Sequence, residues 1–218
     1  MRFFIDCEFI EDGKTIDLLS IGIVAEDGRE FYAINRDCDF SKASDWVEEN
    51  VISKLPANNV NPQTASPSEI EGVLFWKSKF AISTEVAKFL GCSGTPTRTI
   101  DNRPYLRFLR WLGFPGEGIK WTYKWECVDA KPELWAYYAD YDWVAFCQLF
   151  GTMMDLPTGF PMYCLDIKQE CDRLGNPKLP TQGKGEHNAL DDARWNKKAW
   201  EFLQSYSIEV PCFSTEVT

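Results

Sequence analysis

The chain contains one histidine, His187, among 218 residues, and none of its eight cysteines belongs to a Cys-x-x-Cys pair. The missing pair argues against a zinc ribbon or a thioredoxin-type redox site. Surfaces and cores usually scatter several histidines through a protein of this size. We therefore interpret His187 as a candidate for chemistry.

Long hydrophobic runs are also absent. No uninterrupted apolar stretch reaches the ~18 residues typical of a membrane-spanning helix, and the first residues lack the basic and then apolar regions of a signal peptide. Cys7 and Cys147 lie in apolar periodic segments, where a free cysteine behaves as a small core residue. We expect a protein of the reducing cytoplasm that has no membrane partner.

Positive charge is scarce, because 23 Lys and Arg residues stand against 33 Asp and Glu residues, for a net charge of −10. This balance argues against a protein that coats nucleic acid through bulk electrostatics. It is compatible with an enzyme that handles one strand end, where bound cations supply positive charge locally.

Apolar and aromatic residues are abundant, at 44% and 15% of the chain, with nine tryptophans. That content is enough to bury a sizeable core. We predict a single domain over residues 1–218, with an insertion at about 91–131.

The order of the expected elements predicts an α/β fold. Three β-branched and aliphatic segments at the N-terminus, with Asp27-Gly28 as a hairpin turn, predict antiparallel strands. Later segments alternate between strand and helix patterns, which predicts parallel strands in the same mixed sheet, flanked by helices. Either Ser41 or Ser44 caps the first helix. The expected strands are 2–9, 15–25, 29–35, 121–125, 134–139 and 162–165, and the expected helices are 44–55, 67–90, 143–154, 167–174 and 189–204.

Asp6 and Glu8 lie two residues apart in the first apolar strand. Side chains at this spacing point to the same face of a strand, so the two carboxylates project together while Cys7 faces the other way. Paired carboxylates on an apolar strand need a compensating cation, and hard oxygen ligands select Mg²⁺ or Mn²⁺. The alternative is an edge strand that carries two solvated acids.

His187 follows a glycine-rich loop and precedes the last expected helix, which carries Asp192 in its first turns. An imidazole with an ordinary pKa near ~6.5 can take a proton from water at neutral pH, as a general base does. In the alternative interpretation, His187 marks a helix entry where Asp191 and Asp192 interact with the helix dipole.

Together, the two motifs resemble the DEDDh family of 3′–5′ exonucleases, which implies a ribonuclease H-like fold. The family has a third carboxylate at the start of a helix that follows a middle strand. Asp142 matches it, because an aromatic residue precedes it and an aliphatic helix follows. Asp140 is the competing choice and would otherwise be a helix cap.

Further segments resemble the polyadenylate-specific exoribonuclease family known as RNase AS. The likeness extends over roughly the first 55 residues and over Pro132–Phe202. The segment Gly91–Lys131 departs from it, being longer than the family's connection. The segments that carry the likeness are Phe9–Ile16, Leu19–Val24, Glu133–Tyr138, Gln148–Gly151 and Pro161–Cys164.

The resemblance implies a metal-dependent exoribonuclease that acts on single-stranded RNA 3′ ends and releases 5′-mononucleotides. Two Mg²⁺ or Mn²⁺ ions would be held ~3.5–4 Å apart by four carboxylates, and His187 would accept the proton of the attacking water. A preference for adenylate tails and a homodimer are further implications of the family. The four implied metal ligands are Asp6, Glu8, Asp142 and Asp192.

A basic stripe of Arg103, Arg107 and Arg110 lies opposite an apolar face on a helical wheel. Residues 98–131 contain seven Lys and Arg against four Asp and Glu. With Trp121 and Trp125 nearby, the stripe is a candidate guide for a single strand. The alternative is a solvated helix face over an insertion with its own small core.

Three other functions remain open on the same pattern. A DNA exonuclease would use the same site, because the group that reads the RNA 2′-hydroxyl cannot be located from the sequence. A non-catalytic binding module could keep the fold, and a partner-binding protein could use the aromatic insertion as its interface.

Overall fold

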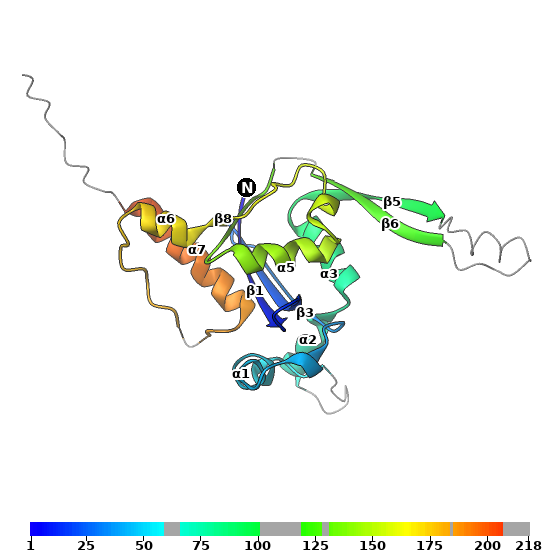
Figure 1. Ribbon diagram of the computed structural model, residues 1–218, viewed down its shortest axis with the longest axis horizontal. Helices are drawn as coiled ribbons and strands as arrows, with labels where there is room; N and C mark the ends of the chain where they lie inside the picture. Colours follow the sequence, from blue (N-terminus) through cyan, green and yellow to red (C-terminus); the bar gives the residue numbers. More distant parts are fainter. Residues whose placement is uncertain (59–65, 101–118, 128–130, 184, 207–218) are drawn as a thin grey trace, which may run out of the picture.

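The computed structural model describes residues 1–58, 66–100, 119–127, 131–183 and 185–206, and its centre is a six-stranded sheet (Figure 1). The strand order is β4-β3-β2-β1-β7-β8. β1, β2 and β3 pair in antiparallel fashion, whereas β4, β7 and β8 join through parallel pairing. The strands are β1 (Arg2–Glu11), β2 (Ile16–Ala25), β3 (Glu30–Asn35), β4 (Trp76–Lys77), β7 (Glu133–Ala136) and β8 (Leu165–Asp166).

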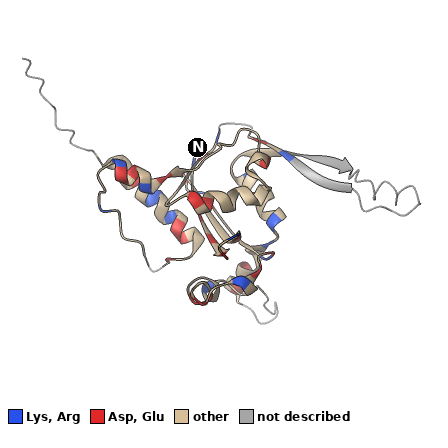
Figure 2. Ribbon diagram, viewed as in Figure 1, with Lys and Arg blue, Asp and Glu red and all other residues tan. Residues whose placement is uncertain are grey.

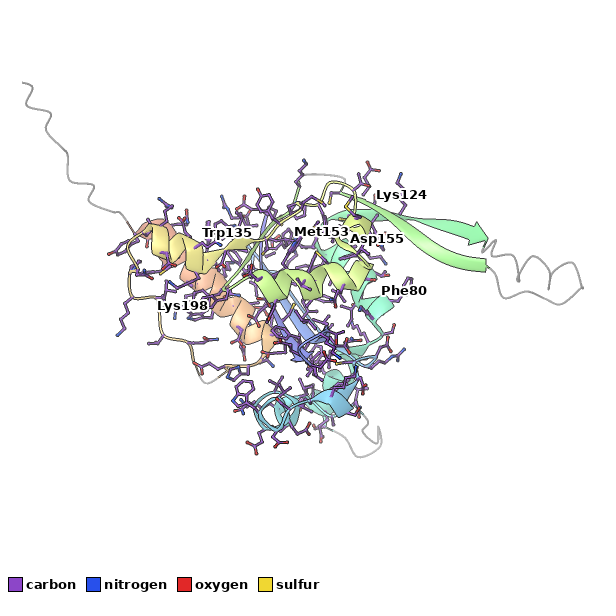
Figure 3. All side chains as sticks on the ribbon, in the orientation of Figure 1. Phe80, Lys124, Trp135, Met153, Asp155 and Lys198 are labelled. Atoms are coloured by element: carbon purple, nitrogen blue, oxygen red, sulfur yellow. The ribbon has the colours of Figure 1, made fainter. Side chains whose placement is uncertain are left out.

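Helices cover both faces of this sheet (Figure 1). α3 and α5 pack on one face, against Phe3 and Ile5 of β1. α6 and α7 pack on the other face, against Phe4 of β1, and Trp135 of β7 adds to this second cluster (Figure 3). The mixed sheet with helices on both faces confirms the predicted α/β class and is consistent with a ribonuclease H-like fold. The helices are α1 (Asp45–Asn50), α2 (Pro67–Leu74), α3 (Lys79–Phe89), α5 (Asp140–Phe150), α6 (Ile167–Arg173) and α7 (Ala189–Ser205), with short 3-10 turns η1 (Phe40–Lys42), η2 (Ile52–Lys54) and η3 (Met153–Asp155).

None of the helices in the described part of the chain has the length and apolar character needed to cross a membrane.

The hairpin between β2 and β3 forms at the predicted turn. Gly28 has φ 91°, a conformation that glycine adopts without steric cost. Its N–H donates to the Ala25 carbonyl at 3.0 Å, and the Ala25 N–H donates to Arg29 at 2.8 Å. The predicted antiparallel N-terminal strands are therefore confirmed.

Several predicted elements differ from the structure. The single helix expected over 67–90 is wrong, because β4 divides it into α2 and α3. Trp76 leaves the helix to pair with Ile34 at the sheet edge and to donate its indole N–H to the Pro56 carbonyl at 2.9 Å. Ser78 then caps α3. Sheet pairing and a new cap outweigh the helical periodicity.

The strand expected over 162–165 is shifted to Leu165–Asp166, where it pairs with β7 in parallel. The helix expected over 44–55 is likewise shorter, since α1 ends at Asn50 and η2 follows it. Ser44 is the N-cap of α1, with its hydroxyl accepting from the Val47 N–H at 3.3 Å. The structure thus decides between the two candidate caps.

A separate two-stranded sheet reaches away from the body (Figure 1). It consists of β5 (Cys92–Ile100) and β6 (Ile119–Cys127), so the strand predicted over 121–125 is confirmed. The predicted basic stripe of Arg103, Arg107 and Arg110 lies outside the described residues. The role of that stripe therefore stays a prediction, as does the insertion at about 91–131.

Gly22 of β2 allows the first turn of α7 to approach the sheet closely. A Cβ atom at this position would overlap the backbone of Ala189 and Leu190. Because Asp192 lies in this turn, the close approach of glycine also sets the distance of Asp192 from the sheet.

We expect Gly22→Ala to lower the free energy of unfolding by about 1–3 kcal/mol, the usual cost of overpacking. Urea denaturation measures this change. Gly183→Ala is the matched control, because a Cβ there meets no atom within 4 Å. Equal stability of the two variants would contradict the role assigned to the close approach.

Candidate active site

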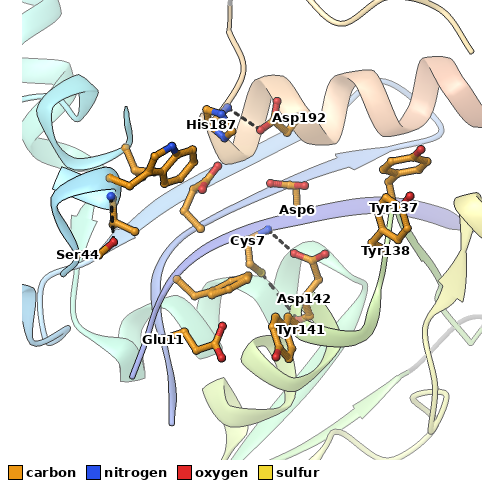
Figure 4. Close-up of a pocket in the computed structure, with 15 residues that line it drawn as sticks. Asp6, Cys7, Glu11, Ser44, Tyr137, Tyr138, Tyr141, Asp142, His187 and Asp192 are labelled. Atoms are coloured by element: carbon orange, nitrogen blue, oxygen red, sulfur yellow. Dashed lines mark hydrogen bonds between the residues drawn. The ribbon is translucent and has the colours of Figure 1, made fainter. Parts of the chain in front are cut away.

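A cleft of about 540 Å³ opens where β1, α1, α5 and α7 meet (Figure 4). Its walls come from segments far apart in the sequence. All five residues expected from the sequence line it: Asp6, Glu8, Asp142, His187 and Asp192.

β1 distributes its side chains as the alternation predicts. Asp6 lies on the side of the strand that faces α7, and Cys7 lies on the side that faces α5 (Figure 4). The Cys7 thiol is 3.9 Å from the Asp142 carbonyl oxygen. On the other side, the Asn196 amide of α7 donates to the Ile5 carbonyl at 2.8 Å and also hydrogen-bonds to Asp6. The strand therefore supplies acids to the cleft and anchors them from both faces.

Asp142 is held at the start of α5. Only 6% of its surface is exposed, and its Oδ1 accepts the Cys7 backbone N–H at 2.7 Å. Asp140 is exposed and does not line the cleft. The geometry thus favours Asp142 over Asp140 as the third carboxylate.

His187 and Asp192 are joined at the entry of α7. The His187 backbone N–H donates to Asp192 Oδ2 at 2.9 Å (Figure 4). The Gln182 amide donates to the other carboxylate oxygen. Asn188 caps the helix by accepting from the Leu190 N–H at 3.1 Å. His187 has φ 68°, a left-handed conformation that costs an L-residue roughly 1–2 kcal/mol. The hydrogen bond to Asp192 helps to offset this strain.

Gln182, Asn196 and Trp46 were not assigned to the site from the sequence. Gln182 lies between the helices expected at 167–174 and 189–204, and Trp46 lies within the first expected helix. Trp46 contacts the His187 ring edge to face, with centroids 4.9 Å apart and planes at 82°. It remains 53% exposed. A tryptophan in the first turn of a helix, two residues after the Ser44 cap, is the sequence feature that could have indicated it.

Ligand atoms of Glu8, His187 and Asp192 lie within 4.8 Å of one another, the one such group among the described residues. Asp6 and Asp142 stand outside this group of three. They are nevertheless close to the other acids. The charge of Asp142 contributes to the raised pKa values of Asp6 and Glu8.

Burial and like charge act together on the carboxylates. Burial raises the pKa of Glu8 to about 7, with contributions from Asp192 and Asp142. Burial likewise raises the pKa of Asp142 to about 7, although the Cys7 N–H opposes it. The pKa of Asp6 is also raised by burial and then by its acidic neighbours, and burial raises the pKa of Asp192 despite two hydrogen bonds. Such a cluster is stabilised by a bound cation.

Acidic residues mark the first turns of α5 and α7, at the two helix ends that border the cleft (Figure 2). A ribonuclease H-like sheet with converging carboxylates and one histidine is the arrangement expected of a phosphodiester-cleaving nuclease.

Comparison with known proteins agrees with this class. Residues 1–204 match the model of the Rv2179c-like 3′–5′ exoribonuclease domain. Two proteins of Mycobacterium tuberculosis, the 3′–5′ exoribonucleases Rv2179c of strain H37Rv and MT2234.1 of strain CDC 1551, are each 33% identical over 205 residues, covering 94% of both chains. The chain belongs to the Rv2179c-like 3′–5′ exoribonuclease family, whose members are hydrolases of phosphodiester bonds.

The raised pKa values make the stability of the metal-free protein depend on pH. Glu8 and Asp142 shift from ordinary values of 4.5 and 3.8 to about 7 in the folded state. Between these values the folded protein binds more protons than the unfolded chain, so stability falls as pH rises.

We therefore expect the melting temperature in excess chelator to be higher at about pH 5.5 than at about pH 8. Replacing chelator by Mg²⁺ should flatten this dependence, because the cation stabilises the ionised carboxylates. Differential scanning calorimetry measures the melting temperature of the unsubstituted protein and of Glu8→Gln, which lacks one of the two carboxylates with a pKa raised to about 7. A metal-free protein that becomes more stable over this interval would contradict the assigned repulsion.

Proposed function

We propose that this protein is a metal-dependent exoribonuclease of the DEDDh type that removes 5′-mononucleotides from the 3′ end of single-stranded RNA. The observation that carries the proposal is the convergence of four carboxylates from β1, α5 and α7 beside His187 in one cleft. Burial first, and like charge second, raise the pKa of these carboxylates, and a bound cation would offset both effects.

The donor set fits hard divalent cations. Carboxylate oxygens suit Mg²⁺ or Mn²⁺, and the group of Glu8, His187 and Asp192 offers ligand atoms within 4.8 Å. We propose that Asp6, Glu8, Asp142 and Asp192 together hold two ions. When bound, such ions neutralise the carboxylates and stabilise the charge that develops on the attacking and leaving oxygens.

His187 has two roles open to it in this geometry. As a general base, its imidazole accepts the proton of the attacking water. As a ligand, it completes the group formed with Glu8 and Asp192. We favour the first role, because the backbone N–H of His187 rather than its ring binds Asp192, which leaves both ring nitrogens available. The edge-to-face contact with Trp46 restricts the orientation of the His187 ring.

The primary test compares two acids that lie two residues apart in the sequence. Asp142→Asn should abolish the Mg²⁺-dependent shortening of RNA from its 3′ end, since it removes a buried carboxylate of the site. Asp140→Asn is the matched control, because Asp140 is exposed and does not line the cleft. The assay follows 5′-labelled RNA on a sequencing gel. Full activity of Asp142→Asn would refute the proposal.

His187→Ala should lower kcat by about 10²–10⁴-fold, the usual contribution of a general base. Titration calorimetry with Mn²⁺ separates the two roles of this residue. Unchanged metal affinity supports the base, whereas a parallel loss of Mn²⁺ binding assigns His187 as a ligand.

Substrate preference extends the proposal beyond the family's shared activity. The resemblance to RNase AS supports a preference for adenylate tails, and we propose that preference here. Degradation of matched RNA and DNA oligomers separates exoribonuclease from DNA exonuclease activity. RNA homopolymers of each base test the adenylate preference. Equal degradation of DNA and RNA would favour the DNA exonuclease instead. The homodimer and the cytoplasmic setting remain predictions.

A further inference from the structure

We propose that Tyr138 is a stacking platform for an RNA base next to the scissile phosphate. This inference rests on the proposed function, because it assigns a residue that would hold the RNA in the same cleft. The ligand class is a nucleobase of single-stranded RNA.

Tyr138 combines wide exposure with a place in the cleft. It follows β7 directly, lines the cleft with Asp6 and Asp142, and is 62% exposed. In Figure 4, Tyr137 and Tyr138 lie at one end of the cleft and Ser44, the cap of α1, lies at the other end. Asp6 lies between Ser44 and the two tyrosines. An aromatic ring at this end can meet a base on one side of the cleaved bond.

The backbone of Tyr138 is strained, with φ 57°. Among the described non-glycine residues, left-handed conformations occur at Tyr138, Asn176 and His187. Asparagine adopts this region readily, but a bulky aromatic does not. The two less ordinary cases both line the cleft. Strain of this kind persists where the surrounding structure holds a residue for a purpose, such as presenting a side chain to a ligand.

Asp166 fixes this backbone conformation. Its Oδ1 accepts the Tyr138 N–H and its Oδ2 accepts the Ala139 N–H, each at 3.3 Å. The same carboxylate caps α6 by accepting the Lys168 N–H at 2.6 Å. The turn that presents Tyr138 is thus tied to the start of α6.

The Tyr138 ring is supported from one side. It meets Tyr137 edge to face, with centroids 4.7 Å apart, and Tyr137 in turn meets Trp195 of α7 at 5.0 Å. This row of rings anchors Tyr138 to the body while most of its surface stays accessible. Base stacking on an aromatic side chain requires such a held and accessible ring, and it tolerates any base.

The test uses Tyr138→Ala, Tyr138→Phe and Tyr163→Ala. Tyr163 is the matched control, because it is also 62% exposed and does not line the cleft. We expect Tyr138→Ala to raise the KM for RNA by about 5–100-fold, the range for loss of one stacked base. Tyr138→Phe should restore it. For an RNA whose nucleotides next to the scissile phosphate are abasic, Tyr138→Ala should raise the KM much less, because no base remains there to stack on the ring.

A second measurement reports stacking directly. Binding of RNA that carries 2-aminopurine near its 3′ end is followed in an Asp142→Asn background, and quenching should depend on an aromatic residue at position 138. An equal rise of the KM for the RNA and for its abasic counterpart would overturn the proposal, because it would show that the ring does not act on a base. An unchanged KM for RNA would also overturn it, while Mg²⁺-dependent activity lost in Asp142→Asn would still support the proposed function.

Discussion

Mutual repulsion among buried carboxylates is the constraint on which this structure depends. Burial is the largest cause of the raised pKa at Asp6, Glu8 and Asp142, and the acidic neighbours add to it. Such groups separate or draw in water unless the fold holds them together. In the proposed function, a bound divalent cation would offset this unfavourable arrangement, because ionised carboxylates attract it strongly. Stability without metal and affinity for metal would then be opposed at the same residues.

Strand pairing, hydrogen bonds and close packing hold the repelling carboxylates in place. β1 pairs with β2 from Phe3 to Glu11, past both of its acids, and with β7 only at Arg2–Phe4. The Cys7 N–H and the Gln182 amide each bind a carboxylate directly. Gly22 permits α7 to approach the sheet with its acidic first turn. Each acid is thus fixed by an element that the core packs independently, which limits relaxation of the cluster.

Aromatic residues line the cleft on two sides of the carboxylates. Trp46 contacts the catalytic candidate His187 on one side, and Tyr137 and Tyr138 form the other end. Between them lie carboxylates that repel phosphate unless cations are bound. In the proposed function, an RNA 3′ end that enters this cleft would meet aromatic rings and bound cations. This arrangement explains how a protein with a net charge of −10 can belong to a family of exoribonucleases.

Local pattern was enough to determine part of this protein. Alternation placed Asp6 and Glu8 on one face of a strand, and the Asp27-Gly28 turn set the first hairpin, because both depend on residues close in sequence. The sequence favoured Asp142 with Asp140 as the competing choice, and the geometry also favours Asp142, because it lines the cleft and accepts the Cys7 N–H across 135 positions. The division of the 67–90 segment, the contact of Trp46 with His187 and the strained turn at Tyr138 likewise arise only when distant strands and helices meet. Sequence carries the chemical groups and their local faces, whereas tertiary packing decides which of them share a cleft, since that depends on long-range pairing and burial.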